Sequence, residues 1–170
     1  MRKIMTKNTD DSERFAKLIK ETKFAMLTTI AESGELHSRP MTLVEHEFEG
    51  QLWFFTGKNS DLAKQIQAHS NVNLAFANIK DNSYVSACGD AAILKDSAKE
   101  KELWNPLYKA WFPEGLEDPN LCLLKVDVRS ADYWESPAAT IVKLVGFAKA
   151  VVTGKPAGSS VGQHGHITIS

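Results

Sequence analysis

Two short stretches decide the fold and the site of this chain: His37-Ser38-Arg39-Pro40-Met41 and Trp53-Phe54-Phe55-Thr56-Gly57-Lys58-Asn59-Ser60. Each has the pattern of a strand that ends among polar residues. Pro40 has no backbone N–H to donate, so it marks an edge or an irregular point of a sheet, where a ligand can approach the backbone. The second stretch ends an apolar strand in hydroxyl groups and a lysine. Together they predict a cationic, hydroxyl-rich pocket for a phosphate at the ends of two neighbouring strands, with space for a planar apolar ligand beside it.

Hydrophobic periodicity and turn residues predict strands that alternate with single helices. The expected strands cover residues 24–30, 36–44, 51–56, 72–78, 84–94 and 121–128, and a last edge strand carries Tyr133 and Trp134. The expected helices cover about residues 11–21, 61–69, 98–104 with a further segment to 112, and 138–152. Hairpin-linked strands interrupted by helices favour an antiparallel sheet closed into a barrel with flanking helices, a mainly β fold of the α+β class.

Two of these strands carry further information. The aromatic run Trp53-Phe54-Phe55 predicts burial on both faces of its strand. Gly89 lies inside the strand 84–94 and predicts a bulge or a barrel corner there.

Length and composition predict one cytoplasmic domain. The chain has 170 residues, enough to bury a core, and we expect a domain over residues 1–153 and a flexible C-terminal tail over 154–170, which is rich in Gly, Ser, Pro and His. The net charge is −1 and no basic stripe is present, so nucleic acid is not an expected partner. No signal peptide begins the chain and no apolar run reaches the ~20 residues that cross a bilayer. Cys88 and Cys122 have no metal-site spacing and are expected to be buried free thiols.

Arg39 is the strongest single candidate for a binding residue. Its planar guanidinium suits two-pronged contact with a phosphate. The alternative is a surface arginine paired with Glu45 or Glu47. The adjacent Pro40 favours the phosphate interpretation, because irregular strand points are where ligands approach.

Thr56, Lys58 and Ser60 form the second candidate element, and Lys64 lies one helical turn further on. Ser60 stands at a predicted helix N-terminus, where backbone amides and the helix dipole favour an anion. The alternative is a simple helix cap at Ser60, with the two lysines as solvated charges.

The tryptophans, the histidines and the potential catalytic side chains point less directly to a site. Trp104, Trp111 and Trp134 are typical of a core or a dimer interface, although Trp134 lies beside charged residues where its ring can be shared with a partner molecule. His164 and His166 indicate at most weak, incidental metal binding. No nucleophile with a base, and no paired carboxylates, can be identified, so any chemistry is expected to come from a cofactor.

Several segments of the chain resemble a known family. The segments 38–41, 52–56 and 84–89, together with Trp104, Trp111-Phe112-Pro113-Glu114-Gly115, Asp118-Pro119 and Ala131-Asp132-Tyr133-Trp134, are similar to the pyridoxamine 5'-phosphate oxidase-like split barrels, in the branch of the bacterial general stress proteins. The resemblance covers roughly residues 15–155.

The resemblance implies a six-stranded antiparallel split β-barrel that forms a homodimer, with FMN in two equivalent grooves at the subunit interface. The alternative cofactor is FAD or another phosphate-bearing molecule in the same groove. The implied phosphate ligands are Arg39, Thr56, Ser60 and Lys58. Pro40, Met41 and Thr42 would line the flavin ring, and Trp134 resembles the tryptophan that the second subunit lends to the site.

Two departures from the family pattern limit what the resemblance implies. Leu62 occupies a position where relatives often carry a lysine. Lys58 or Lys64 would have to supply the positive charge of that missing lysine. No Arg-x-His element follows Trp134, so pyridoxamine 5'-phosphate oxidation is not expected. The expected function is that of a flavin-dependent oxidoreductase of unknown substrate linked to stress response. The alternative is a non-catalytic protein that stores or senses flavin.

Overall fold

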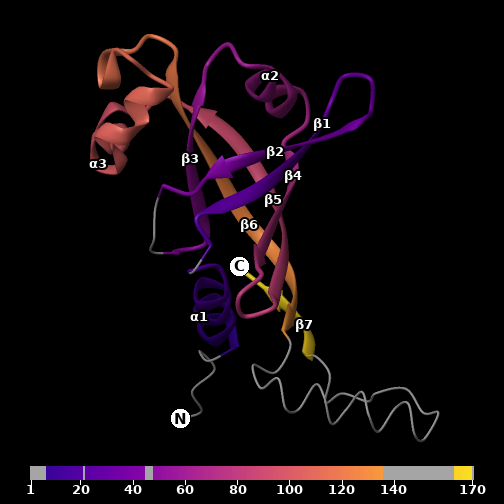
Figure 1. The fold of residues 1–170 in the computed structure, drawn as a ribbon. Coiled ribbons are helices and arrows are strands. Elements are labelled where there is room, and N and C mark those ends of the chain that lie inside the picture. The colour runs from indigo at the N-terminus through magenta and orange to yellow at the C-terminus, as the bar shows by residue number, and fades with distance from the viewer. Residues whose placement is uncertain (1–6, 21, 45–47, 136–162, 170) are drawn as a thin grey trace, which may run out of the picture.

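The computed structural model describes residues 7–20, 22–44, 48–135 and 163–169, and Figure 1 shows their arrangement. The helices are α1 (Lys7–Ile19), α2 (Asp61–Ala68) and α3 (Ser97–Leu103), followed by two short 3-10 helices, η1 (Pro106–Ala110) and η2 (Gly115–Glu117). The strands are β1 (Phe24–Ile30), β2 (Leu36–Thr42), β3 (Gln51–Gly57), β4 (Asn71–Asn78), β5 (Ser83–Leu94), β6 (Leu121–Glu135) and β7 (Gln163–Thr168).

The described strands form one seven-stranded antiparallel sheet in the order β2-β1-β4-β5-β6-β3, with β7 added beside β6. The sheet curls, because the Val44 N–H after β2 donates to the Trp53 carbonyl of β3 at 3.1 Å and so joins the two ends of the strand order. The predicted α+β class and antiparallel split barrel are confirmed. The described sheet has one strand more than the six that the resemblance implies.

Two helices close opposite ends of the barrel (Figure 1). In α1, Phe15 is fully buried, and its ring centroid lies 4.6 Å from that of Phe48 and 6.2 Å from that of Phe76. In α2, the buried side chains are Leu62, Ala63 and Ile66, which lie on one face of the helix. The core between them is filled by alternate residues of the strands, as expected when one face of a sheet is buried.

The strand β3 is buried on one face only. Leu52, Phe54 and Thr56 are buried, whereas Trp53 and Phe55 are half-buried. The prediction of burial on both faces is therefore wrong. The outer aromatic rings pack against the α3–η1 segment, which covers this face incompletely.

The long strand β6 replaces the two strands that the sequence predicts. Tyr133 and Trp134 continue β6, flanked by β5 and β7, so the prediction of a separate edge strand is wrong. The register between β5 and β6 shifts at Cys88/Gly89, where Arg129 has no partner on β5, so the predicted bulge is confirmed. The polar pair Arg129 and Ser130 marks this irregularity rather than the end of a strand.

The C-terminal segment contributes a strand to the sheet. Residues 163–168, predicted to be in a flexible tail, form β7 and pair with residues 130–135 of β6. Ile167 is 1% exposed and Ile169 is 8% exposed, so the strand is held by core packing as well as by backbone hydrogen bonds. The predicted helix 138–152 and the domain boundary at residue 153 lie outside the described residues.

No helix among the described residues is long and apolar enough to cross a membrane. The cytoplasmic location stays a prediction.

We expect Gly89→Ala to lower the free energy of unfolding by about 1–3 kcal/mol, the usual cost of overpacking. A Cβ atom at Gly89 would lie 2.4 Å from the Asp127 carbonyl oxygen, which belongs to the sheet backbone and cannot move aside. Chemical denaturation measures the change.

Gly57→Ala is the matched control, because its Cβ would meet the side-chain amide of Asn120, with the nitrogen at 2.7 Å, rather than the backbone of the sheet. A smaller loss is expected there. Equal losses at the two positions would contradict the assigned close approach at the bulge.

Candidate functional site

A cavity of about 450 Å³ opens where the ends of β2 and β3 meet the start of α2 and the η1 segment. Its lining combines the predicted strand ends with residues far apart in the sequence: Phe24, Arg39, Pro40, Met41, Thr42, Val44, Phe55, Thr56, Gly57, Ser60, Leu62, Tyr108, Trp111 and Phe112. We call it the α2 pocket.

One end of the α2 pocket is suited to an anion. Ser60 caps α2, and its Oγ accepts a hydrogen bond from the Ala63 N–H at 3.1 Å. The Thr56 and Ser60 hydroxyl oxygens lie 3.4 Å apart. The N-terminus of a helix offers backbone N–H groups and the positive end of its dipole, so these hydroxyls surround a favourable position for a negative charge.

Arg39 adds a full positive charge to this end. Its Nη1 donates to Thr29 Oγ1 at 2.8 Å and its Nη2 donates to Gln65 Oε1 at 2.9 Å, so both acceptors are neutral. Within the described part of the chain, no carboxylate forms an ion pair with Arg39; the suggested partners Glu45 and Glu47 lie outside it. Burial lowers the pKa of the Arg39 guanidinium, and the Asp61 carboxylate acts in the opposite direction.

The other walls of the α2 pocket are apolar. Phe55, Trp104 and Tyr108 form an aromatic cluster with ring centroids 5.2–5.8 Å apart, and Phe55 and Tyr108 face the pocket. Burial raises the pKa of the Tyr108 phenol, which favours its protonated form. The space between these aromatic rings and strand β2 can accommodate a flat ligand.

The structure brings most of the predicted site residues together. Those that line the α2 pocket are Arg39, Pro40, Met41, Thr42, Thr56 and Ser60. Lys58 is exposed and does not line it, and Lys64 is bound to Asp61 at 3.3 Å on the outer side of α2.

Trp134 lies away from the pocket of its own chain. It is 45% exposed on β6, and its ring stacks on His164 with centroids 5.1 Å apart. Its expected contribution to the site of a second subunit stays a prediction.

Several pocket residues escaped the sequence analysis. Tyr108, Trp111 and Phe112 come from the η1 segment, where a run of aromatic residues between Pro106 and Pro113 was the available signal. Leu62 also lines the pocket and is 6% exposed, so no lysine of α2 supplies a second cation there. Trp104 lies behind Phe55 rather than in the pocket.

The comparison with known families identifies the fold. Residues 10–157 match the family described as "Pyridoxamine 5'-phosphate oxidase like". The chain belongs to the pyridoxamine 5'-phosphate oxidase-like family.

Three relatives in or near this family are similar over most of the chain. The protein bli-3 of Neurospora crassa is 32% identical over 145 residues, which are 79% of this chain and 69% of that protein. A general stress FMN/FAD binding protein from Xanthomonas citri is 33% identical, with a TM-score of 0.67 over 77% of this chain and 92% of its own. A candidate general stress protein 26 from Jannaschia sp. CCS1 is 25% identical, with a TM-score of 0.73 over 95% of this chain and 99% of its own.

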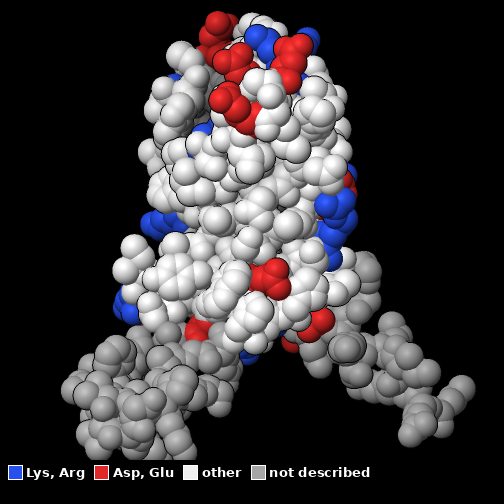
Figure 2. All heavy atoms as spheres, turned by 90° about the vertical axis from the view of Figure 1, so that its right-hand side faces the viewer, with Lys and Arg blue, Asp and Glu red and all other residues white. Residues whose placement is uncertain are grey.

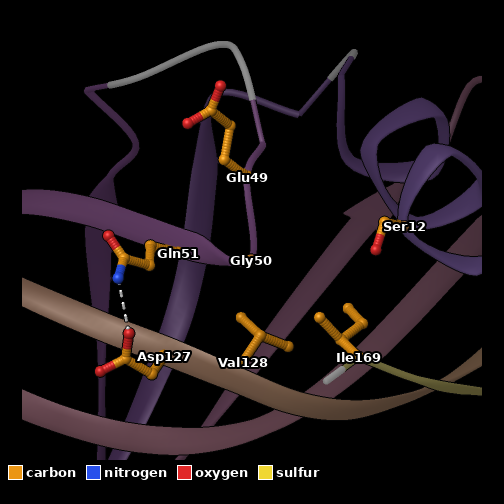
Figure 3. A pocket seen from close by; sticks show the side chains of 7 residues that line it. All are labelled: Ser12, Glu49, Gly50, Gln51, Asp127, Val128 and Ile169. Atoms are coloured by element: carbon orange, nitrogen blue, oxygen red, sulfur yellow. Dashed lines mark hydrogen bonds between the residues drawn. The ribbon is translucent and has the colours of Figure 1, made fainter. Parts of the chain in front are cut away.

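A second cavity, of about 320 Å³, lies beside α1 (Figure 3). Ser12, Glu49 and Ile169 line it, and Gln51 Nε2 donates to Asp127 Oδ1 at 2.9 Å. Asp127 is also bound to Lys125 at 2.9 Å. The Asp127 carboxylate is therefore already engaged within the chain, and the residues that line this cavity include neither a cation nor an aromatic ring, unlike those of the α2 pocket. Over the described ranges, no group of three or more His, Cys, Asp or Glu side chains is placed to hold a metal ion.

The two cysteines differ in environment. Cys88 is exposed, so the prediction that it is buried is wrong: on β5 it faces outward between the buried Ala87 and Gly89. Cys122 is buried, as predicted, and its thiol donates to the Thr56 carbonyl at 3.2 Å directly behind the anion end of the pocket.

We expect Cys122 to resist alkylation in the native protein at pH 8.5 and to react after denaturation. Burial, assisted by the Glu100 carboxylate, raises its pKa to about 11, so the reactive thiolate is scarce at that pH. Mass spectrometry after treatment with iodoacetamide locates the label. Labelling of native Cys122 at the rate of a free thiol would contradict the assigned burial.

Proposed function

We propose that this protein binds FMN in the α2 pocket and acts as a flavin-dependent oxidoreductase. The observation that carries the proposal is the half-buried Arg39 guanidinium, whose described partners are neutral, placed at one end of an aromatic pocket beside a helix N-terminus. A phosphate at that end and a planar ring along the rest match this distribution of charge and apolar surface. The Xanthomonas citri relative is named as an FMN/FAD binding protein, which supports a flavin.

The residues of the chain have separate tasks in this proposal. Arg39 and the hydroxyl groups of Thr56 and Ser60 hold the phosphate. Pro40, Met41 and Thr42 lie along the ring, opposite the aromatic wall that contains Tyr108. FAD is the alternative ligand, because it carries the same ring and a phosphate at the same end of the ribityl chain.

The open entrance of the α2 pocket favours a redox role over flavin storage. Trp104 does not line the pocket, and Trp111, which does, is 69% exposed. Neither ring closes the pocket, so a small electron donor or acceptor can reach a ligand there. A bound flavin supplies hydride and single-electron transfer, and the protein binds and orients it. The relatives named as general stress proteins support a link with stress response.

A homodimer completes the proposal. One side of the molecule carries few charged side chains across its middle (Figure 2). On the outward face of the sheet, Met26, Ala75 and Ser86 form one row across β1, β4 and β5, and Tyr84 and Trp134 are paired on the same face. Small and apolar side chains on an open face suit contact with a second copy, which would place Trp134 near the partner's flavin.

We expect Arg39→Ala to weaken FMN binding about 10- to 100-fold and to change riboflavin binding by less than about threefold. A charge-assisted hydrogen bond contributes about 1.5–3 kcal/mol, and riboflavin lacks the phosphate that receives it. Quenching of flavin fluorescence measures both affinities.

Lys64→Ala is the control, because it removes the same charge from the outer side of α2. It is expected to leave both affinities within about threefold. A wild-type protein that does not quench either flavin well above micromolar concentrations would refute the proposed function. Equal losses for the two ligands would show that Arg39 does not contact the phosphate.

We expect the wild-type protein to sediment as a dimer, and Ala75→Arg to sediment as a monomer with weaker FMN binding. The new guanidinium would place a charge in the middle of the outward row between Met26 and Ser86. Ala68→Arg, at the exposed end of α2, is the matched control and should remain dimeric. A monomeric wild-type protein at micromolar concentration would contradict the shared site.

A further inference from the structure

The side chain of Arg39 belongs to a closed ring of hydrogen bonds. Thr29 Oγ1 donates to Gln65 Oε1 at 2.6 Å, while Arg39 Nη1 donates to Thr29 Oγ1 and Arg39 Nη2 donates to Gln65 Oε1. Thr29 is 1% exposed, so the ring is anchored in the barrel interior. Both terminal nitrogens of the guanidinium are thereby held from the side of the core.

The Gln65 amide is itself oriented. Its Nε2 lies 3.4 Å from His37 Nδ1, which leaves the amide oxygen for Arg39 and Thr29. A guanidinium can only donate, so the amide oxygen is the end of Gln65 that can meet it. His37, Arg39 and Gln65 therefore interlock between β2 and α2.

The position of Gln65 couples the two anion-attracting features of the pocket. Gln65 lies one turn and a half beyond Ser60 on α2, the helix whose N-terminus borders the pocket. A bond from Gln65 to Arg39 fixes the guanidinium of β2 relative to that N-terminus. Neither feature can move away from the other without breaking the ring.

The chemistry of the acceptors explains how the charge is kept available. A carboxylate at either acceptor position would hold Arg39 equally well but would neutralise it. A hydroxyl and an amide oxygen hold the same geometry without a countercharge. An anion entering the α2 pocket then meets a positioned cation that forms no ion pair with a carboxylate among the described residues, although the Asp61 carboxylate acts on it from beyond contact distance.

We infer that Thr29 and Gln65 are positioning residues that set the selectivity of the α2 pocket for a phosphate monoester over the uncharged ligand. They act through Arg39 and need not touch the ligand. The inference rests on the proposed binding of FMN and assigns the source of its phosphate preference.

The decisive comparison is between Gln65→Glu and Gln67→Glu. Both variants add one negative charge to α2, but Gln67 is exposed and has no part in the ring. We expect Gln65→Glu to reduce the ratio of FMN affinity to riboflavin affinity by about tenfold or more, because an ion pair with Arg39 competes with the phosphate. Gln67→Glu should change that ratio by less than about threefold. Equal effects of the two variants would overturn the inference.

A second pair of variants tests the hydroxyl group. Thr29→Val keeps the shape of the side chain but removes the acceptor for Nη1, whereas Thr29→Ser keeps the hydroxyl. Thr29→Val should lower the FMN-to-riboflavin ratio, and Thr29→Ser should restore it. A merely structural role would affect both flavins alike, so an unchanged ratio in Thr29→Val would count against the inference. The two Thr29 variants also test the inference if Gln65→Glu does not fold.

The outcomes separate the inference from the proposed function. A wild-type protein that binds no flavin overturns both. A wild-type protein that binds FMN and riboflavin equally overturns the inference but leaves FMN binding in place. If wild-type protein prefers FMN and Arg39→Ala loses that preference while Gln65→Glu keeps it, the proposed function stands and the positioning role of Gln65 is wrong.

Discussion

The structure depends on the pairing of one long strand, β6, along both of its edges. Backbone donors and acceptors in a sheet interior must be satisfied, and the 15 residues of β6 pair with β5 on one side and with β3 and then β7 on the other. The bulge at Gly89 lets this strand bend between its two halves. The pairing of Leu121 with Gly57 then fixes where β3 ends, and so where α2 begins.

The α2 pocket follows from that end point. Thr56 and Ser60 stand where β3 gives way to α2, and the curled sheet brings the end of β2 to the same place. Arg39 enters from β2 and is held by neutral oxygens, so its charge stays directed at the pocket. The aromatic wall comes from η1. Charge at one end and rings along the other walls are a combination that recognises an anionic, planar ligand.

Much of this could be predicted from the sequence where the signal is local. The strand ends, the cap at Ser60 and the inward face of α2 depend on neighbours in the chain. The sequence did not show that Tyr108 and Trp111 line the pocket, because hydrophobic periodicity does not reveal which distant aromatic rings pack beside β3. The strand β7 was missed because residues 163–168 carry one large apolar side chain, Ile167. Gly165 was the overlooked signal: the Tyr133 ring lies over it, where no Cβ would fit.

A crystal structure of the protein grown with FMN tests the central claim most directly. The account predicts the phosphate within hydrogen-bond distance of the Arg39 guanidinium and Ser60 Oγ, with the Arg39–Thr29–Gln65 ring intact and the flavin ring along Pro40, Met41 and Thr42. An FMN molecule with its phosphate away from Arg39, or bound outside the α2 pocket, would contradict it.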